Sequence, residues 1–578
     1  MASNTSLVAT AAAPRRGGVL RLLPALTLAL LIGPVAAGLI GTALPAFGYM
    51  PALGGDAFGL APWRTLLATP GLGEMVRLSA VSGIATTALS LAIVILFVAA
   101  WHGTPVFARL QRLLSPLLAV PHVTVAFGLA FLLAPSGWLV RLVSPWATGF
   151  QRPPDVLIVQ DPAGLALIAG LVVKEIPYLF LMTLAALGQT DATRVRTLAR
   201  TLGYGPVTAW LKAVFPRVYP QIRLPVYAVL AYGVSVVDVA LVLGPTTPPT
   251  LAIQLVRWFN DPDLALRFVA SAGALLQLGL AAAAIAGWWC AERLAIAVGR
   301  WWIRGGWRGR RDGALRHGAA VLLSGAFAAA FLGLGGMAVW SVTGTWRFPD
   351  ALPTRLSLDS WLRNADSLVL AGWHTIAVGV VAALVAASLA VGCLENEAQR
   401  GSRRTGRALW LLYLPLLVPQ IAFLFGAQVL LVVLGVDGTW LAIVWAHLVY
   451  VLPYVFLSLA DPWRSWDGRY GRSAACLGAG PWRVFHAVKL PMLARPLLVA
   501  LAVGFAISVG QYLPTLFAGA GRFATLTTEA VSLAASGNRR VIGVYALLQM
   551  ALPFLAFLLA ALVPAWLFRN RRGLKITV

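Results

Sequence analysis

The sequence has little charge and almost no cysteine. Only 11% of its 578 residues are charged and 59% are hydrophobic, whereas about 25% of a soluble domain is charged. The cysteines at 290, 393 and 476 lack C-x-x-C spacing, which excludes a disulfide framework or zinc site of that kind. A G-x-x-x-x-G-K-[ST] phosphate loop is missing, because every lysine follows Val or Leu, and no H-x-x-x-H or carboxylate cluster indicates a metal. These shortages argue against a soluble domain, a metal site and an ATPase.

Long apolar runs dominate instead. Each is long enough to cross the hydrocarbon core as a helix. They predict an all-α polytopic membrane protein with about 12 transmembrane helices, and an even number places both termini on one side. The runs cover residues 22–44, 78–100, 114–135, 164–187, 224–246, 268–292, 318–341, 372–393, 408–434, 438–460, 496–519 and 542–567.

The chain has a net charge of +25, and the distribution of its basic residues fits this predicted topology. Lys and Arg cluster on alternate loops, as the positive-inside rule requires of short cytoplasmic loops. We therefore expect both termini in the cytoplasm and no nucleic-acid partner. Arg522, Arg539 and Arg540 are exceptions, since they fall in a loop assigned to the outside.

The chain contains an internal repeat. Residues 199–216 read ARTLGYGPVTAWLKAVFP and residues 474–491 read AACLGAGPWRVFHAVKLP, at an offset of 275. The preceding spans match around Pro177 and Pro453, and the following spans share Ala-Leu-Leu-Gln at 274–277 and 546–549. We predict one repeat over 1–297, a basic cytoplasmic linker over 298–317 and a second repeat over 318–578. Six spans in each copy predict parallel repeats.

In these two segments the sequence resembles the permeases of binding-protein-dependent ABC importers. Their cytoplasmic loop reads approximately E-A-A, three residues, G, nine residues, I-x-L-P. Gly203 and Gly478 match the glycine, Pro216 and Pro491 the proline, and Ala199 and Ala474 the second alanine; the glutamate falls on Thr197 and Arg472. The fused two-copy form is similar to the iron, thiamine and polyamine permeases, with a type I importer fold.

The resemblance implies a permease subunit of the bacterial inner membrane that moves a small solute from periplasm to cytoplasm. It implies no cofactor and no enzymatic activity, because a separate ABC ATPase dimer would hydrolyse ATP. The other implied partners are a periplasmic solute-binding protein and membrane lipid. A secondary transporter is the alternative, since it also has parallel six-helix halves but does not require twin Gly-Pro loops.

The glycines and prolines of the repeated loop favour a rigid structure. Residues 191–202 predict a helix that Gly203 ends in a left-handed conformation, and Pro206 suits the first turn of a second short helix. The alternative is a tight turn without a partner. The predicted ATPase-coupling residues are Ala199, Gly203, Gly205, Pro206, Trp210 near the tip, Pro216, Ala474, Gly478, Gly480, Pro481, Phe485 and Pro491.

Polar residues inside the spans mark a candidate solute path, because charge within a bilayer is costly. The candidates are Lys174, Glu175, Asp238 and Gln511. Adjacent helical residues point about 100° apart, so Lys174 and Glu175 cannot simply neutralise each other, and at least one needs a partner on another helix. A structural ion pair or a snorkelling lysine is the alternative. His122 and His447 are expected to be hydrogen-bonded rather than metal ligands.

Overall fold

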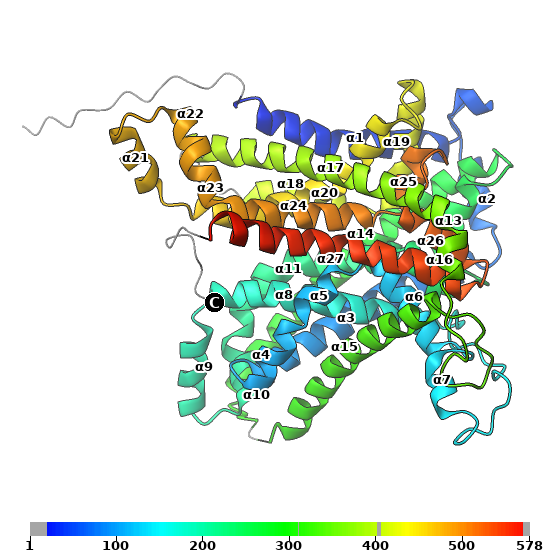
Figure 1. Cartoon of the computed structure of the whole chain (residues 1–578), viewed down its shortest axis with the longest axis horizontal. Coiled ribbons are helices and arrows are strands. Elements are labelled where there is room, and N and C mark those ends of the chain that lie inside the picture. Colours follow the sequence, from blue (N-terminus) through cyan, green and yellow to red (C-terminus); the bar gives the residue numbers. More distant parts are fainter. Residues whose placement is uncertain (1–19, 310, 401–405, 570–578) are drawn as a thin grey trace, which may run out of the picture.

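The computed structural model describes residues 20–309, 311–400 and 406–569, and within them the chain is a bundle of helices without a sheet (Figure 1). The termini, part of the predicted basic loop near residue 400, and Arg310 lie outside the described residues. Eight long helices form the frame of the bundle: α1 (Leu23–Ala46), α3 (Leu72–Trp101), α8 (Leu165–Gly188), α14 (Leu266–Arg304), α15 (Gly313–Ser341), α17 (Ala365–Arg400), α20 (Trp440–Arg464) and α27 (Arg539–Leu567).

Nine candidate spans in the described residues are long and apolar enough to cross a membrane, or eleven if two bent pairs each count as one span. This confirms the polytopic helical class and comes close to the predicted 12. The predicted span at 224–246 is not among them, because it is divided between α11 (Phe215–Ser235) and α12 (Asp238–Leu243). Gln221, Arg223 and several tyrosines lower the hydropathy of α11.

Four predicted spans are broken, two in each half. In the first half α5 (Leu114–Ala119) gives way to α6 (His122–Leu133), and α11 to α12; in the second, α18 (Gly406–Leu417) gives way to α19 (Gln420–Val433), and α24 (Ala494–Val509) to α25 (Leu513–Gly519). Pro121 and Pro419 lie at matching breaks and donate no backbone hydrogen bond. Such breaks at membrane depth require protein or a cavity around them.

The two halves are interlocked, because the first helix of each packs on the other half: α1 lies against α19, and α15 against α6. Glycines permit the close approach. A Cβ added at Gly426 would lie 2.0 Å from the carbonyl oxygen of Gly38, and one added at Gly128 would lie 2.8 Å from the backbone of Gly333. Small residues at helix crossings are the usual means of packing membrane helices tightly.

The short helices gather at the two ends of the bundle. The repeated loops, with α9 (Ala192–Thr201) and α10 (Pro206–Ala213) in one and α21 (Gly468–Cys476) and α22 (Pro481–Val484) in the other, lie at the same end (left in Figure 1). The opposite end carries α2 (Ala61–Leu67), α7 (Trp138–Val143), α13 (Leu251–Phe259), α16 (Asp359–Arg363) and α26 (Leu526–Ala534). Two repeats in the same orientation would be expected to give this arrangement.

The irregular segment between the halves is shorter than the linker predicted over 298–317. α14 continues to Arg304 and α15 begins at Gly313, so only residues 305–312 connect the two helices. The helices extend past the apolar core because residues up to Arg304 are acceptable helix formers, whereas Gly305 and Gly306 favour termination.

Candidate coupling loops and central cavity

The first repeated loop is a helix, a left-handed turn and a second helix. Gly203 follows α9 with φ of +84°. Its N–H donates to the carbonyl of Arg200 at 2.9 Å, and the Tyr204 N–H donates to the carbonyl of Ala199 at 3.3 Å. This bond pair is the Schellman end of a helix, which favours glycine. Pro206 then occupies the first position of α10. The predicted backbone of this loop is confirmed.

The second repeated loop has the same construction. Gly478 follows α21 with φ of +84°. The Gly478 N–H donates to Ala475 at 2.9 Å, and the Ala479 N–H donates to the carbonyl of Ala474 at 3.0 Å. Pro481 begins α22, which continues into a π-helical turn over Phe485–Lys489 and then α23 (Leu490–Met492). Ala199 and Ala474 therefore supply equivalent carbonyl acceptors at matched helix ends.

The structure corrects one expectation about these loops. Trp210 was predicted near the tip, but its side chain is fully buried, 6.1 Å from the ring of Phe215. It therefore anchors α10 to the first half and cannot itself contact a partner. Phe485 is half-buried, 6.2 Å from the ring of Trp463, which gives it a similar anchoring position in the second half.

Exposed apolar side chains occupy the tips instead. Leu202 is 64% exposed, Leu477 is 88% exposed and Trp482 is 77% exposed. The sequence analysis did not select them. The leucine that precedes the turn glycine in both copies could have indicated the first two, because a leucine has little reason to recur at an exposed turn unless something covers it.

A cavity of about 750 Å³ lies between the two halves, where the broken helices meet. All four predicted path residues line it: Lys174 and Glu175 from α8, Asp238 from the start of α12, and Gln511 from the break between α24 and α25. The structure thus brings together four residues that are as much as 337 positions apart in the chain.

Lys174 and Glu175 bond to opposite sides of one helix break. The Lys174 ammonium donates to the carbonyls of Leu117 at 3.0 Å and Val120, at the carboxyl end of α5. The Glu175 carboxylate lies 3.4 Å from Nε2 of His122, the first residue of α6. A cation at a helix C-terminus and an anion at a helix N-terminus are both stabilised by the helix dipoles. The expected need for partners on another helix is confirmed.

Asp238 and the backbone of Gln511 also have hydrogen-bond partners. The Tyr232 hydroxyl donates to Asp238 at 3.3 Å, and the backbone carbonyl of Gln511 accepts from the Thr515 hydroxyl at 3.0 Å. His447, behind the cavity wall, bonds to the hydroxyls of Ser508 at 2.7 Å and Thr515 at 2.9 Å. The prediction of a hydrogen-bonded His447 is therefore confirmed.

The two walls of the cavity differ in charge. Lys174, Glu175 and Asp238 all belong to the first half. Tyr450 occupies the position of Lys174 at an offset of 276, and its buried hydroxyl has no hydrogen-bond partner among the described residues. Gln420 follows Pro419 as His122 follows Pro121. The wall from the second half is therefore polar but uncharged in its described residues.

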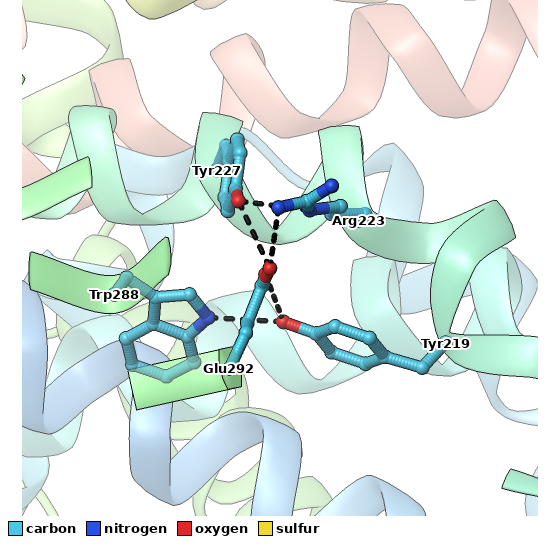
Figure 2. Close-up of polar contacts among 5 residues, drawn as sticks. All are labelled: Tyr219, Arg223, Tyr227, Trp288 and Glu292. Carbon is cyan, nitrogen blue, oxygen red and sulfur yellow. Dashed lines mark hydrogen bonds and ion pairs between the residues drawn. The ribbon is translucent and has the colours of Figure 1, made fainter. Parts of the chain in front are cut away.

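A polar cluster joins α11 to α14 close to the first loop (Figure 2). The Glu292 carboxylate accepts from the hydroxyls of Tyr219 at 2.6 Å and Tyr227 at 3.1 Å, and lies 2.7 Å from the guanidinium of Arg223. The indole N–H of Trp288 donates to the Tyr219 oxygen at 3.0 Å. The sequence analysis missed this cluster, although an acidic residue within a long apolar helix could have indicated it.

Interlocked halves of membrane helices, a cavity between them and twin helical loops at one end define the transmembrane subunit of a transporter. The chain belongs to the ABC transporter permease family. It is 34% identical over 520 residues to the inner membrane ABC transporter permease protein YnjC of Escherichia coli K12, covering 90% of this chain and 93% of that protein. No family model matches the chain.

Two further relatives match a shorter part of the chain. The spermidine/putrescine transport system permease protein PotC of Escherichia coli K12 is 21% identical over 206 residues, which is 35% of this chain and 77% of that protein. The putative 2-aminoethylphosphonate transport system permease protein PhnV of Salmonella typhimurium LT2 is 26% identical over 214 residues, 36% of this chain and 79% of that protein. These relatives are transport permeases, not enzymes.

Proposed function

We propose that this ABC permease imports a small solute that a periplasmic binding protein delivers, driven by an ATPase dimer that docks on the twin loops. The observation that carries the proposal is the repetition of one helix ending, built on Gly203 and Gly478, at the same end of both halves. A rigid helix, turn and helix transmits the displacement of a soluble partner better than a flexible loop does.

The surface of the loops supports docking. Leu202, Leu477 and Trp482 present apolar side chains that would be covered by a partner. Arginines accompany them and can pair with acidic groups: Arg194, Arg196, Arg200, Arg472 and Arg483. One loop in each half fits one ATPase subunit per half, and therefore an ATPase dimer beneath a single permease chain.

The basic loops favour a cytoplasmic location for this end, and with it cytoplasmic termini in a bacterial inner membrane. The exceptional Arg539, in a loop assigned to the outside, has a structural use. Its guanidinium donates to the carbonyl of Ser136 at 3.0 Å and lies 5.4 Å from the ring of Trp340. Held in this way, Arg539 does not argue against the assigned orientation.

The partial relatives support the division into repeats over 1–297 and 318–578. PotC and PhnV match about a third of this chain but more than three quarters of their own length, as expected of proteins that carry one copy. The names of these two relatives give spermidine/putrescine and 2-aminoethylphosphonate as the transported solutes. Solutes of similar size fit the cavity between the halves. We propose Lys174, Glu175, Asp238 and Gln511 as residues of its wall along the solute path.

The test is co-purification of an ATPase from mild detergent with the chain and with the double variant Gly203→Arg plus Gly478→Arg. A matched control is Gly54→Arg plus Gly435→Arg, because these glycines also have positive φ. They precede α2 and α20 in the chain, away from the repeated loops, since α2 lies at the opposite end and α20 reaches the second loop only at its C-terminus. We expect ATP hydrolysis in the eluates of the wild type and the control, and its loss from the loop variant. A well-folded wild-type chain that never retains an ATPase would overturn the proposal.

A further inference from the structure

The two coupling loops have the same backbone conformation at their turns, but different residues cover them. The connector between the halves runs over 305–312, and its described residues, 305–309, 311 and 312, fold over the start of α10. The Gly205 N–H donates to the carbonyl of Arg308 at 2.9 Å, and the Val207 N–H donates to the Asp312 carboxylate at 3.0 Å. At Gly309 the connector passes so close that an added Cβ would lie 2.1 Å from the Thr208 hydroxyl oxygen.

The far end of α10 is bound to the same segment. The Lys212 ammonium donates to the carbonyls of Trp302 at 3.0 Å and Trp307 at 2.8 Å. It also lies 4.6 Å from the centre of the Trp302 ring, a cation–π distance. The second helix of the first loop is therefore held at both of its ends by residues that connect the two halves.

The cluster around Glu292 closes a continuous set of contacts among α10, α11, α14 and the connector, which we call the bracket. α10 continues directly into α11, and Glu292 binds α11 to α14 through Tyr219, Arg223 and Tyr227 (Figure 2). α14 then leads into the connector, which returns to α10. Every side of the bracket is therefore bonded to the next, which restrains α10 against the first half of the permease.

The second half does not carry the residues of this bracket. At the repeat offset of 275, Tyr219, Arg223 and Tyr227 correspond to Ala494, Leu498 and Ala502, and at the offset of 272, Trp288 and Glu292 correspond to Ala560 and Pro564. No residue of α22 is buried. The second loop is held at its base, where Lys489 pairs with Glu395 at 2.6 Å.

We propose that residues 302–309, 311 and 312 form a clasp on the first coupling loop, so that the two ATPase subunits meet unlike docking sites. This inference rests on the proposed function. The first site is rigid and basic, since the exposed Arg304, Arg308 and Arg311 of the clasp lie beside it, and it fits an acidic face of an ATPase subunit. The second site is an apolar tip formed by Leu477 and Trp482, on which the described part of the chain places no clasp.

Hydrogen exchange on the full-length chain in lipid nanodiscs, without any ATPase, tests the clasp itself. We expect the amides of Gly205 and Val207 to exchange at least about tenfold more slowly than those of the matched Gly480 and Trp482. The reason is that buried bonds, to the Arg308 carbonyl and to the Asp312 carboxylate respectively, must open first. Asp312→Ala should remove most of the difference at Val207. Asp312→Asn, which keeps an acceptor oxygen, should remove less of it.

Glu395→Ala is the control for loosening in general, since it releases the base of the second loop and should leave exchange at Val207 unchanged. Equal exchange at the matched amides of the wild-type chain would overturn the clasp. So would an Asp312→Ala variant in which Val207 exchanges at the wild-type rate.

Thiol labelling tests whether the docking sites are unlike. Cys476 is exposed on the second loop, and Thr201 is its counterpart at the offset of 275. In a Cys290→Ala and Cys393→Ala background, labelling is followed at Cys476, and separately at residue 201 in Thr201→Cys plus Cys476→Ser. We expect a bound ATPase to slow labelling at both positions. Asp312→Ala should reduce this protection about tenfold at residue 201 and leave the protection of Cys476 unchanged.

Equal loss of protection at both positions, or no loss at either, would overturn the unlike docking sites. The two proposals fail in different ways. If no ATPase binds the wild-type chain, the proposed function is refuted, and the exchange rates at Val207 and Trp482 still decide whether the clasp exists.

Discussion

Replacing Gly478 by alanine should weaken coupling without unfolding the protein. Gly478 has φ of +84°, and an added Cβ would meet no atom within 4 Å. The cost of Gly478→Ala therefore comes from the backbone and not from a clash. No residue of α21 is buried, so the cost falls on the local geometry of the second loop rather than on the core.

The magnitude follows from two opposing effects. A left-handed conformation costs a residue with a Cβ roughly 1–2 kcal/mol. Part of this is offset, because alanine restricts the unfolded chain more than glycine by about 0.4–1 kcal/mol. The net cost of about 1 kcal/mol lowers the population of the closed turn by a factor of about 5. Gly478→Asn should cost less, since asparagine adopts this conformation more readily.

The assay is ATP hydrolysis by the purified complex, together with the midpoint of thermal unfolding of the permease. We expect Gly478→Ala to lower the hydrolysis rate by up to about fivefold, Gly478→Asn to lower it less, and neither to change the midpoint. Full activity of Gly478→Ala, or an asparagine variant more impaired than the alanine variant, would refute the reasoning that the left-handed turn carries the coupling.

Three further predictions concern the cavity wall, the packing between halves and pH. Lys174→Met should destabilise the chain by about 2–4 kcal/mol in denaturant unfolding, because two carbonyls of the α5 end lose a charged donor; unchanged stability with altered transport would instead assign the lysine to the solute alone. Gly426→Ala should destabilise by about 1–3 kcal/mol through its contact with the backbone of α1, whereas Gly335→Ala, with open space around it, should not. Burial, and then the charge of Arg196, lower the pKa of His102 from 6.5. Folding therefore favours the neutral ring, and this contribution to stability is complete above pH 6.5 and is lost as the pH falls below it. The thermal midpoint of the His102→Gln variant should therefore depend less on acidification than that of the wild-type chain.

The local chemistry of the repeated loops could be predicted from the sequence because it is local. Gly203 needs a left-handed conformation and Pro206 suits a first helical turn whatever surrounds them. The position of Trp210 could not be predicted in this way. Whether an aromatic ring lies at a tip or in the core depends on which helices pack beside it, and Phe215 and the first half cover it.

The candidate path shows the same division. The presence of polar residues within the spans selected Lys174, Glu175, Asp238 and Gln511, and all four line the cavity. The bonding partners of Lys174 and Glu175 lie at the ends of other helices, 54 and 57 positions away for the two carbonyls that accept from Lys174. Those partners exist because the chain breaks at Pro121, and a proline in the sequence indicates a break without showing which side chains fill it.

The sequence by itself determined the membrane class, the repeat and the two loop turns, because each follows from hydropathy over some 20 residues or from the conformational limits of single glycines and prolines. Only the tertiary structure decided that the first helix of each half packs on the other half. It also decided that the described residues of the connector, 305–309, 311 and 312, cover α10 but not α22. Contacts between segments about 100 positions apart, such as Val207 with Asp312, depend on how the helices pack, and no periodicity in the sequence encodes that packing.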